Sequence, residues 1–204
     1  MFIKNLFSDP VLFFAVLISV GLSVCIHEFF HAYIALKCGD STAADAGHLT
    51  LNPLKQMGII SIVMLLLLGI CWGAVPVDPK RLDRKKRIFT ALAGPLTNLM
   101  LFVIGVLLGV LAIKFNVESM VMFTVIFAQV NMVLFCINIA PVPGFDGGTV
   151  LMELIGGEKL YSSELGKGFM IGAFLLLFYL MDYIFAWASW ATAHLLNFLG
   201  NLLI

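Results

Sequence analysis

The chain has 204 residues, of which 61% are hydrophobic and only 12% are charged, and its formal net charge is zero. About a quarter of the residues of an average soluble domain are charged, so this composition excludes a soluble globular protein and indicates an integral membrane protein. The balanced charge gives no indication of a nucleic-acid partner. The length allows one compact bundle of a few spans, so we expect residues 1–204 to form a single membrane-embedded domain.

The first apolar run, residues 11–36, is long enough to form a membrane-spanning helix. It is too long for the apolar region of a cleavable signal peptide, and no small-residue cleavage site follows it, so we expect it to be retained. His27, Glu28 and His31 form an H-E-x-x-H pattern in the second half of this run. On a helix, residues i and i+4 lie on the same face, so both imidazoles can reach one cation while the glutamate acts on a water molecule. A zinc hydrolase needs this arrangement.

Three shorter segments follow the first span. Residues 40–56 form a polar connector, in which the alternation of residues 49–51 predicts a small strand at the membrane edge. Residues 57–77 are apolar but contain glycines and a proline. Their densest part, residues 59–72, has a length typical of a re-entrant or interfacial segment rather than a span. Residues 78–87 hold much of the basic charge and are expected to anchor the chain at anionic headgroups on the cytoplasmic side.

Residues 88–113 and 119–138 are the next two apolar runs long enough to span a membrane. The first contains Gly105-x-x-x-Gly109, a pattern that allows close helix pairing either within the chain or between two protomers of a homo-oligomer. A C-terminal helical segment, residues 168–204, crosses the membrane once or twice. The sequence therefore predicts an all-α integral membrane protein, a polytopic transmembrane helix bundle with a re-entrant segment and a small strand element at the membrane edge.

The positions of lysine and arginine do not decide whether residues 57–77 span the membrane or re-enter it, because both arrangements place nearly the same number inside. Helix geometry favours re-entry. At about 1.5 Å per residue, His27 and His31 lie roughly 9 to 15 Å below the surface marked by Lys37. Asp146 reaches that same face only if residues 57–77 turn back. We therefore expect an outside N-terminus and a site that opens toward the cytoplasm.

Two histidines do not complete a catalytic zinc site, which normally has three protein ligands and an open fourth position. The candidates for the third ligand are His48, Asp146, Glu153 and His194. Asp146 is favoured because it is an acid in an irregular, proline- and glycine-rich segment at membrane depth. Irregular backbone is tolerated there only when it is buried in protein or lines a wet cavity. The alternative is that residues 138–148 form an ordinary loop at the interface.

Four motifs resemble those of the site-2 protease family, the intramembrane zinc metalloproteases. The two most specific are His27-Glu28-x-x-His31 in the first span and Asn138-x-x-Pro141-x-x-x-x-Asp146-Gly147 after the third. The other two are similar to the compact bacterial branch without PDZ or CBS domains: Ala93-Gly94-Pro95-x-x-Asn98 and Gly47-x-Leu49-Thr50-Leu51-Asn52-Pro53. The similarity extends from about residue 26 to residue 148, with the motifs in the order of the family.

This resemblance implies one zinc ion per chain, held by His27, His31 and Asp146. It also implies that Glu28 is the base that takes a proton from water and passes it to the leaving amine. A catalytic core of about residues 11–155 would then precede the C-terminal segment.

By the same resemblance, Asn98 and Asn138 bind the substrate backbone or the developing oxyanion. The alternatives are that Asn98 satisfies backbone groups freed near Pro95 and that Asn138 caps the end of its helix. The chain departs from the branch by having Gln56 where a histidine is common and His48 where an arginine is common. These departures affect substrate handling rather than the chemistry.

The expected function is that of a zinc-dependent intramembrane endoprotease, which hydrolyses a peptide bond within or near a transmembrane segment of a membrane protein substrate. The expected location is the bacterial cytoplasmic membrane, with several spans in the lipid bilayer. One alternative is a metal-binding membrane protein without catalysis, either a transporter or a degenerate protease. Glu28 argues against it, because a structural or transport site needs no base. A membrane protease of the other H-E-x-x-H type would take its third ligand from Glu153, which lies on the wrong side of the Asp146 break.

Overall fold

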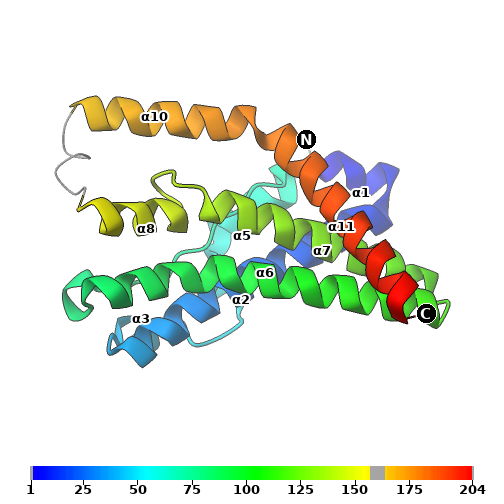
Figure 1. The fold of residues 1–204 in the computed structure, drawn as a ribbon, viewed down its shortest axis with the longest axis horizontal. Coiled ribbons are helices and arrows are strands. Elements are labelled where there is room, and N and C mark those ends of the chain that lie inside the picture. Colours follow the sequence, from blue (N-terminus) through cyan, green and yellow to red (C-terminus); the bar gives the residue numbers. More distant parts are fainter. Residues whose placement is uncertain (1, 157–163, 204) are drawn as a thin grey trace.

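The computed structural model describes residues 2–156 and 164–203, and every regular element in these ranges is helical (Figure 1). The longer helices are α2 (Pro10–Cys38), α5 (Gly58–Leu68), α6 (Arg84–Lys114), α7 (Glu118–Ile139), α8 (Asp146–Ile155), α10 (Glu164–Tyr179) and α11 (Met181–Leu203). Five short turns of helix complete the order: η1 (Phe2–Lys4), α1 (Asn5–Ser8), α3 (Thr42–Asp45), α4 (Pro53–Gln56) and η2 (Pro79–Arg81).

Among the helices that the structure describes, α2, α6 and α7 are each long and apolar enough to cross a membrane. They coincide with the three predicted spans, which confirms a multi-pass helical membrane protein. A fourth crossing is formed if the last two helices, which meet at a bend of 50°, are one broken span. Local signals set the helix ends: Asp9 and Asp83 cap the starts of α2 and α6, and Gly39, with φ of 106°, ends α2.

The core lies where α6 packs along α7 and both contact α2 and α11 (Figure 1). Its buried apolar residues come from α6, α7 and α11: Phe102, Val106, Ala128, Met132, Val133 and Ala188. A Cβ atom on Gly105 would lie 3.1 Å from Ala128, and one on Gly109 would lie 3.0 Å from Leu196. The two glycines of the G-x-x-x-G pattern therefore face other helices of the same chain.

The predicted strand at residues 49–51 is wrong, because the described residues contain no strand. The Gln56 side chain, almost completely buried, donates from Nε2 to the carbonyls of His48 at 2.8 Å and Thr50 at 2.5 Å. A side-chain amide thus takes the hydrogen bonds that a neighbouring strand would have made.

The chain doubles back after α5, which has only 11 residues and ends at Gly69 in the left-handed region. The Ser61 hydroxyl of α5 accepts from the Trp72 amide at 2.9 Å and donates to the Trp72 carbonyl at 2.7 Å. Further on, the Ala74 amide donates to the carbonyl of Gln56 at 3.1 Å. These bonds place the segment 70–77 beside α5, with Ala74 next to the last residue of α4.

Asp40 joins the end of α2 to the end of this returning segment. Its completely buried carboxylate accepts from the amide of Asp78 at 2.7 Å, and from the amide and hydroxyl of Thr42 at 3.0 and 2.5 Å. The Arg81 guanidinium lies 3.9 Å away. Burial alone would raise the pKa of the Asp40 carboxyl, but the bonds from Thr42 and Asp78 and the Arg81 charge outweigh it and lower the pKa below its usual range.

We expect Asp40→Asn to lower the free energy of unfolding by about 1–3 kcal/mol at pH 7, because the asparagine amide cannot accept all of these bonds. Since the pKa of Asp40 is lower in the folded protein, its contribution is complete above the ordinary aspartate pKa of about 3.9. It is then lost as the pH falls through the folded value. Thermal unfolding in detergent between pH 7 and pH 3 measures both effects. The exposed Asp45→Asn is the control, and a difference between wild type and Asp40→Asn that grows as the pH falls would contradict this account.

Candidate metal centre

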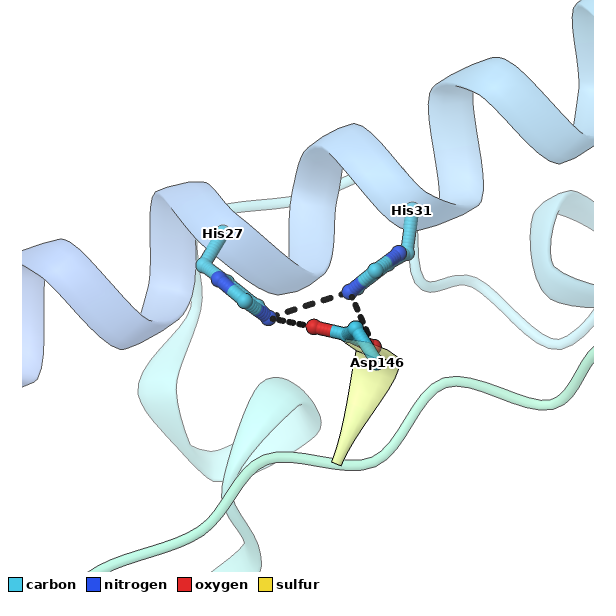
Figure 2. Close-up of side chains that lie close together, drawn as sticks. All are labelled: His27, His31 and Asp146. Atoms are coloured by element: carbon cyan, nitrogen blue, oxygen red, sulfur yellow. Dashed lines mark hydrogen bonds and ion pairs between the residues drawn. The ribbon is translucent and has the colours of Figure 1, made fainter. Parts of the chain in front are cut away.

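His27 and His31 project from α2 toward Asp146, the first residue of α8 (Figure 2). The two Nε2 atoms are 3.0 Å apart. The Asp146 carboxylate oxygens lie 3.1 Å from Nε2 of His27 and 3.2 Å from Nε2 of His31. Three potential ligand atoms from two distant parts of the sequence therefore converge on one point, and all three side chains are at least partly buried.

The segment between α7 and α8 determines where Asp146 lies. Two tight turns follow α7, in which the Val142 amide donates to Ala140 at 2.7 Å and the Phe145 amide donates to Val142 at 3.1 Å. A Cβ atom on Gly147 would overlap the Ile139 carbonyl, so only glycine lets α8 begin this close to the end of α7. Gly147 therefore packs closely against the backbone of the turn. This packing brings Asp146 back toward α2.

The hydrogen bonds behind the histidines leave the Nε2 lone pairs directed at the site. His31 donates from Nδ1 to the Thr90 carbonyl at 2.7 Å, and His27 donates from Nδ1 to Oδ1 of Asn98 at 2.6 Å. A backbone carbonyl only accepts, so the proton of neutral His31 is on Nδ1 and its Nε2 is free to bind a metal. Partners of this kind orient most metal-binding histidines.

The residues fit a zinc ion. With ligand distances of about 2.0–2.1 Å and tetrahedral angles, zinc ligand atoms are roughly 3.3 Å apart. The two Nε2 atoms are 3.0 Å apart, Oδ2 of Asp146 is 3.1 Å from Nε2 of His27, and Oδ1 is 3.2 Å from Nε2 of His31, so each histidine faces a different carboxylate oxygen at a similar distance. Oδ2 of Asp146 is buried and has no hydrogen-bond partner among the described residues. Three acceptor atoms that face one another without a shared proton repel, and a cation removes that repulsion.

Gly94 of α6 provides the space for both histidines, because a Cβ atom there would overlap Nε2 of His27 and Nε2 of His31. We expect Gly94→Ala to remove zinc from the purified protein even though alanine favours a helix by about 1 kcal/mol. Metal analysis after chelator washing measures this loss. Gly21→Ala in α2, where the added methyl meets open space, should keep wild-type zinc, and equal zinc in both variants would refute the role of Gly94.

Glu28 is buried beside the centre and contacts the returning segment. A Cβ atom on Gly73 would overlap the Glu28 carboxylate, so only a glycine here lets the backbone of the returning segment contact this side chain. Glu28, His27, His31 and Asp146 all line one cavity of about 510 Å³. An acid capable of accepting a proton thus borders the same space as the three potential ligands.

Both predicted asparagines line the cavity, but their side chains make different contacts. Asn138, in the last turn of α7, lines the cavity. Asn98 is completely buried behind His27, and its Nδ2 donates to Oδ1 of Asn131 at 3.1 Å. Asn131 in turn donates to the Ser23 hydroxyl at 2.8 Å. This buried chain of side chains joins α2, α6 and α7 and ends on His27.

The other three candidates for the third ligand make different contacts. His48 pairs through Nδ1 with the Gln56 side chain at 3.3 Å. Glu153 accepts from Arg87 at 2.7 and 2.9 Å. His194 stacks on Trp190 with ring centroids 5.1 Å apart. Only Asp146 among the four belongs to the group of described residues that could hold a metal with His27 and His31.

The sequence did not predict that Arg87 and Thr90 of α6 and Asn131 of α7 support the centre, and it gave Asn98 a different role. Arg87, Thr90, Gly94 and Asn98 recur at helical spacing, so they share one face of α6. This spacing was one available signal that the face is shared, although it does not reveal which contacts the face makes. The second signal was Asn131, a polar residue within an apolar span, since such residues usually have a specific partner.

The fold and the centre define a multi-pass helical membrane protein with a potential two-histidine, one-aspartate metal site next to an acidic residue. The chain is 34% identical over 174 residues to the Bacillus subtilis protein named "Putative zinc metalloprotease YwhC", covering 79% of this chain and 78% of that protein. The chain belongs to the site-2 protease family.

Two further relatives carry the same description. The Mycolicibacterium smegmatis "Putative zinc metalloprotease Rip2" is 32% identical over 76% of this chain, which spans 64% of that protein. A Methanocaldococcus jannaschii protein, also named as a "Putative zinc metalloprotease", is 31% identical over 73% of this chain and 77% of its own length. No family model and no solved structure matches the chain. The names of the relatives support a metalloprotease role and zinc as the metal.

Proposed function

We propose that this protein is a zinc-dependent intramembrane endoprotease that cuts a peptide bond within or near a transmembrane segment of another membrane protein. One observation carries the proposal: the Glu28 carboxylate and the three potential zinc ligands border the same cavity. A metal site that serves only structure or transport has no need of a buried acid in contact with the cavity. The names of the relatives support the same reaction class.

In this proposal His27, His31 and Asp146 hold one zinc ion. Bound zinc would make water a stronger acid and polarise the carbonyl of the scissile bond. Glu28 takes a proton from the attacking water and delivers it to the leaving amine nitrogen, so that one peptide bond and one water become one carboxylic acid and one amine.

The two asparagines receive different roles. We assign Asn138, on the cavity wall, to the carbonyl oxygen of the scissile bond. We assign Asn98 to the orientation of His27, because its side-chain oxygen accepts from His27 and its nitrogen donates to Asn131. Because Asn98 also lines the cavity, its expected contact with the substrate stays a prediction beside this supporting role.

The proposed topology has a re-entrant α5 and an active site that opens toward the cytoplasm. The bonds from Ala74 to Gln56 and from Asp78 to Asp40 support it, because they bring the end of the returning segment to both the start of α5 and the end of α2. In a bacterium this places the chain in the cytoplasmic membrane with its N-terminus outside.

We expect cysteines introduced at Lys55 and Asp83 to react with a membrane-impermeant thiol reagent from the cytoplasmic side, and a cysteine at Ser8 to react from the other side. These positions flank α5 and precede α2. The four native cysteines, above all Cys38 near the interface, are first replaced. Labelling of positions 55 and 83 from opposite sides would eliminate the re-entrant segment.

The direct test of the function uses the purified protein with tagged candidate membrane substrates in proteoliposomes. Cleavage should stop when zinc is removed by a chelator and return when zinc is added. Mass spectrometry of the products should place the cut within or close to the transmembrane segment. A cut confined to a distant soluble loop would contradict an intramembrane site.

A further inference from the structure

The helix that carries Asp146 is fastened to α6 by a paired ion contact. Arg87 donates from Nε to Oε1 of Glu153 at 2.7 Å and from Nη2 to Oε2 at 2.9 Å. Both side chains are more than two-thirds buried. Two parallel charge-assisted hydrogen bonds fix orientation as well as distance, so this pair constrains α8 more tightly than a single surface salt bridge.

Asp146 and Glu153 are seven residues apart in α8, which is close to two full turns. They therefore lie on nearly the same side of the helix, Asp146 facing α2 and Glu153 facing the first turns of α6. Any rotation of α8 about its axis moves both carboxylates together. Holding Glu153 thus also limits the directions that Asp146 can take.

Backbone carbonyls also hold the Arg87 side chain in place. Its Nη1 donates to the carbonyls of Leu82 at 2.9 Å and Pro79 at 3.2 Å, which belong to the segment between the returning chain and α6. The guanidinium therefore has a fixed position from which to hold Glu153. Farther along the same face of α6, the Thr90 carbonyl and Asn98 orient the two histidines.

We propose that the Arg87–Glu153 pair is a positioning device that holds α8 so that Asp146 reaches the metal held by His27 and His31. This inference rests on the metal site of the proposed function. Arg87 and Glu153 line the same cavity, but neither belongs to the group of potential metal ligands. Their effect on zinc binding passes through Asp146, and a role that only stabilises the fold would not depend on Asp146.

The test is a double-mutant cycle on the zinc dissociation constant, measured on purified full-length protein in detergent by competition with a chelator. Glu153→Gln, which keeps the shape but removes the charge, should weaken zinc binding by roughly 10- to 100-fold, as loss of outer-shell partners of metal ligands does. In an Asp146→Asn background, which keeps both histidines, the same change should alter binding by no more than about twofold.

Arg87→Lys is the second variant, because lysine keeps the charge but cannot form two parallel bonds with a carboxylate. It should weaken zinc binding in the same Asp146-dependent way. Lys86→Gln is the matched control: it removes a charge from the adjacent, more exposed position, whose amine is 4.0 Å from Asp83, and should leave zinc binding unchanged. Melting temperatures of the zinc-free proteins confirm that each variant is folded.

Unchanged zinc binding in folded Glu153→Gln and Arg87→Lys, or an equal loss with and without Asp146, would overturn the positioning role. Absence of zinc binding by the wild-type protein would instead contradict the metal site. The two failures are therefore distinguishable.

Discussion

We expect the replacement of Glu28 with glutamine to stop detectable peptide-bond hydrolysis and to leave the zinc content close to that of the wild type. The expected loss in rate is about 10²- to 10⁴-fold, the usual contribution of a positioned general base, because a neutral amide cannot accept the proton of water. Zinc is retained because the ligand group consists of His27, His31 and Asp146 and does not include Glu28. The measurement combines cleavage of a tagged membrane substrate with metal analysis of the same purified sample.

The matched control is Glu118→Gln, at the exposed start of α7, which removes an equal charge far from the cavity and should leave cleavage intact. Full activity in purified Glu28→Gln would rule out the proposed mechanism. A wild-type protein that binds zinc but cleaves no membrane substrate would favour the non-catalytic alternative, a transporter or a degenerate protease.

Replacing Asp146 with asparagine should weaken zinc binding more than replacing Glu153 or Arg87 does. An anionic ligand becomes a neutral one, and the repulsion that the cation relieved among three acceptors is reduced. We expect the dissociation constant to rise by more than the roughly 10- to 100-fold that follows removal of an outer-shell partner. Competition with a chelator measures it, and cleavage should be lost in parallel at low zinc concentration.

His48→Asn is the matched control, since His48 was a candidate ligand and instead contacts the Gln56 side chain. It should bind zinc as the wild type does. If Asp146→Asn kept wild-type affinity and His48→Asn lost it, the third ligand would have to be reassigned and the inward placement of α8 would have no chemical explanation.

The three long spans were predictable because each is a long and predominantly apolar run, and a bilayer requires about 20 such residues in a helix. Asp146 was identifiable because acids are rare at membrane depth. Its role as a ligand stays a prediction, but its distances to the histidines are those that the prediction requires.

The failures have equally physical causes. The strand at residues 49–51 was inferred from alternation alone, which carries no information about a partner; the partner is the buried Gln56 side chain. The contact from His31 to Thr90 could not be inferred, because every residue has a backbone carbonyl. The spaces left by Gly73 and Gly94 depend on which segments of the folded chain meet. The spacing of residues along the sequence does not reveal which segments these are.

The buried contacts of His27 also have a consequence for how the protein is made. Asn98, which orients this histidine, lies 71 residues later in the chain, and Asn131 and Asp146 follow still later. Chains are synthesised from the N-terminus, so α2 exists before any of these partners. A nascent chain at that stage has two histidines and no third ligand. Under the proposed function, the complete group of three potential zinc ligands therefore exists only after α8 has been made.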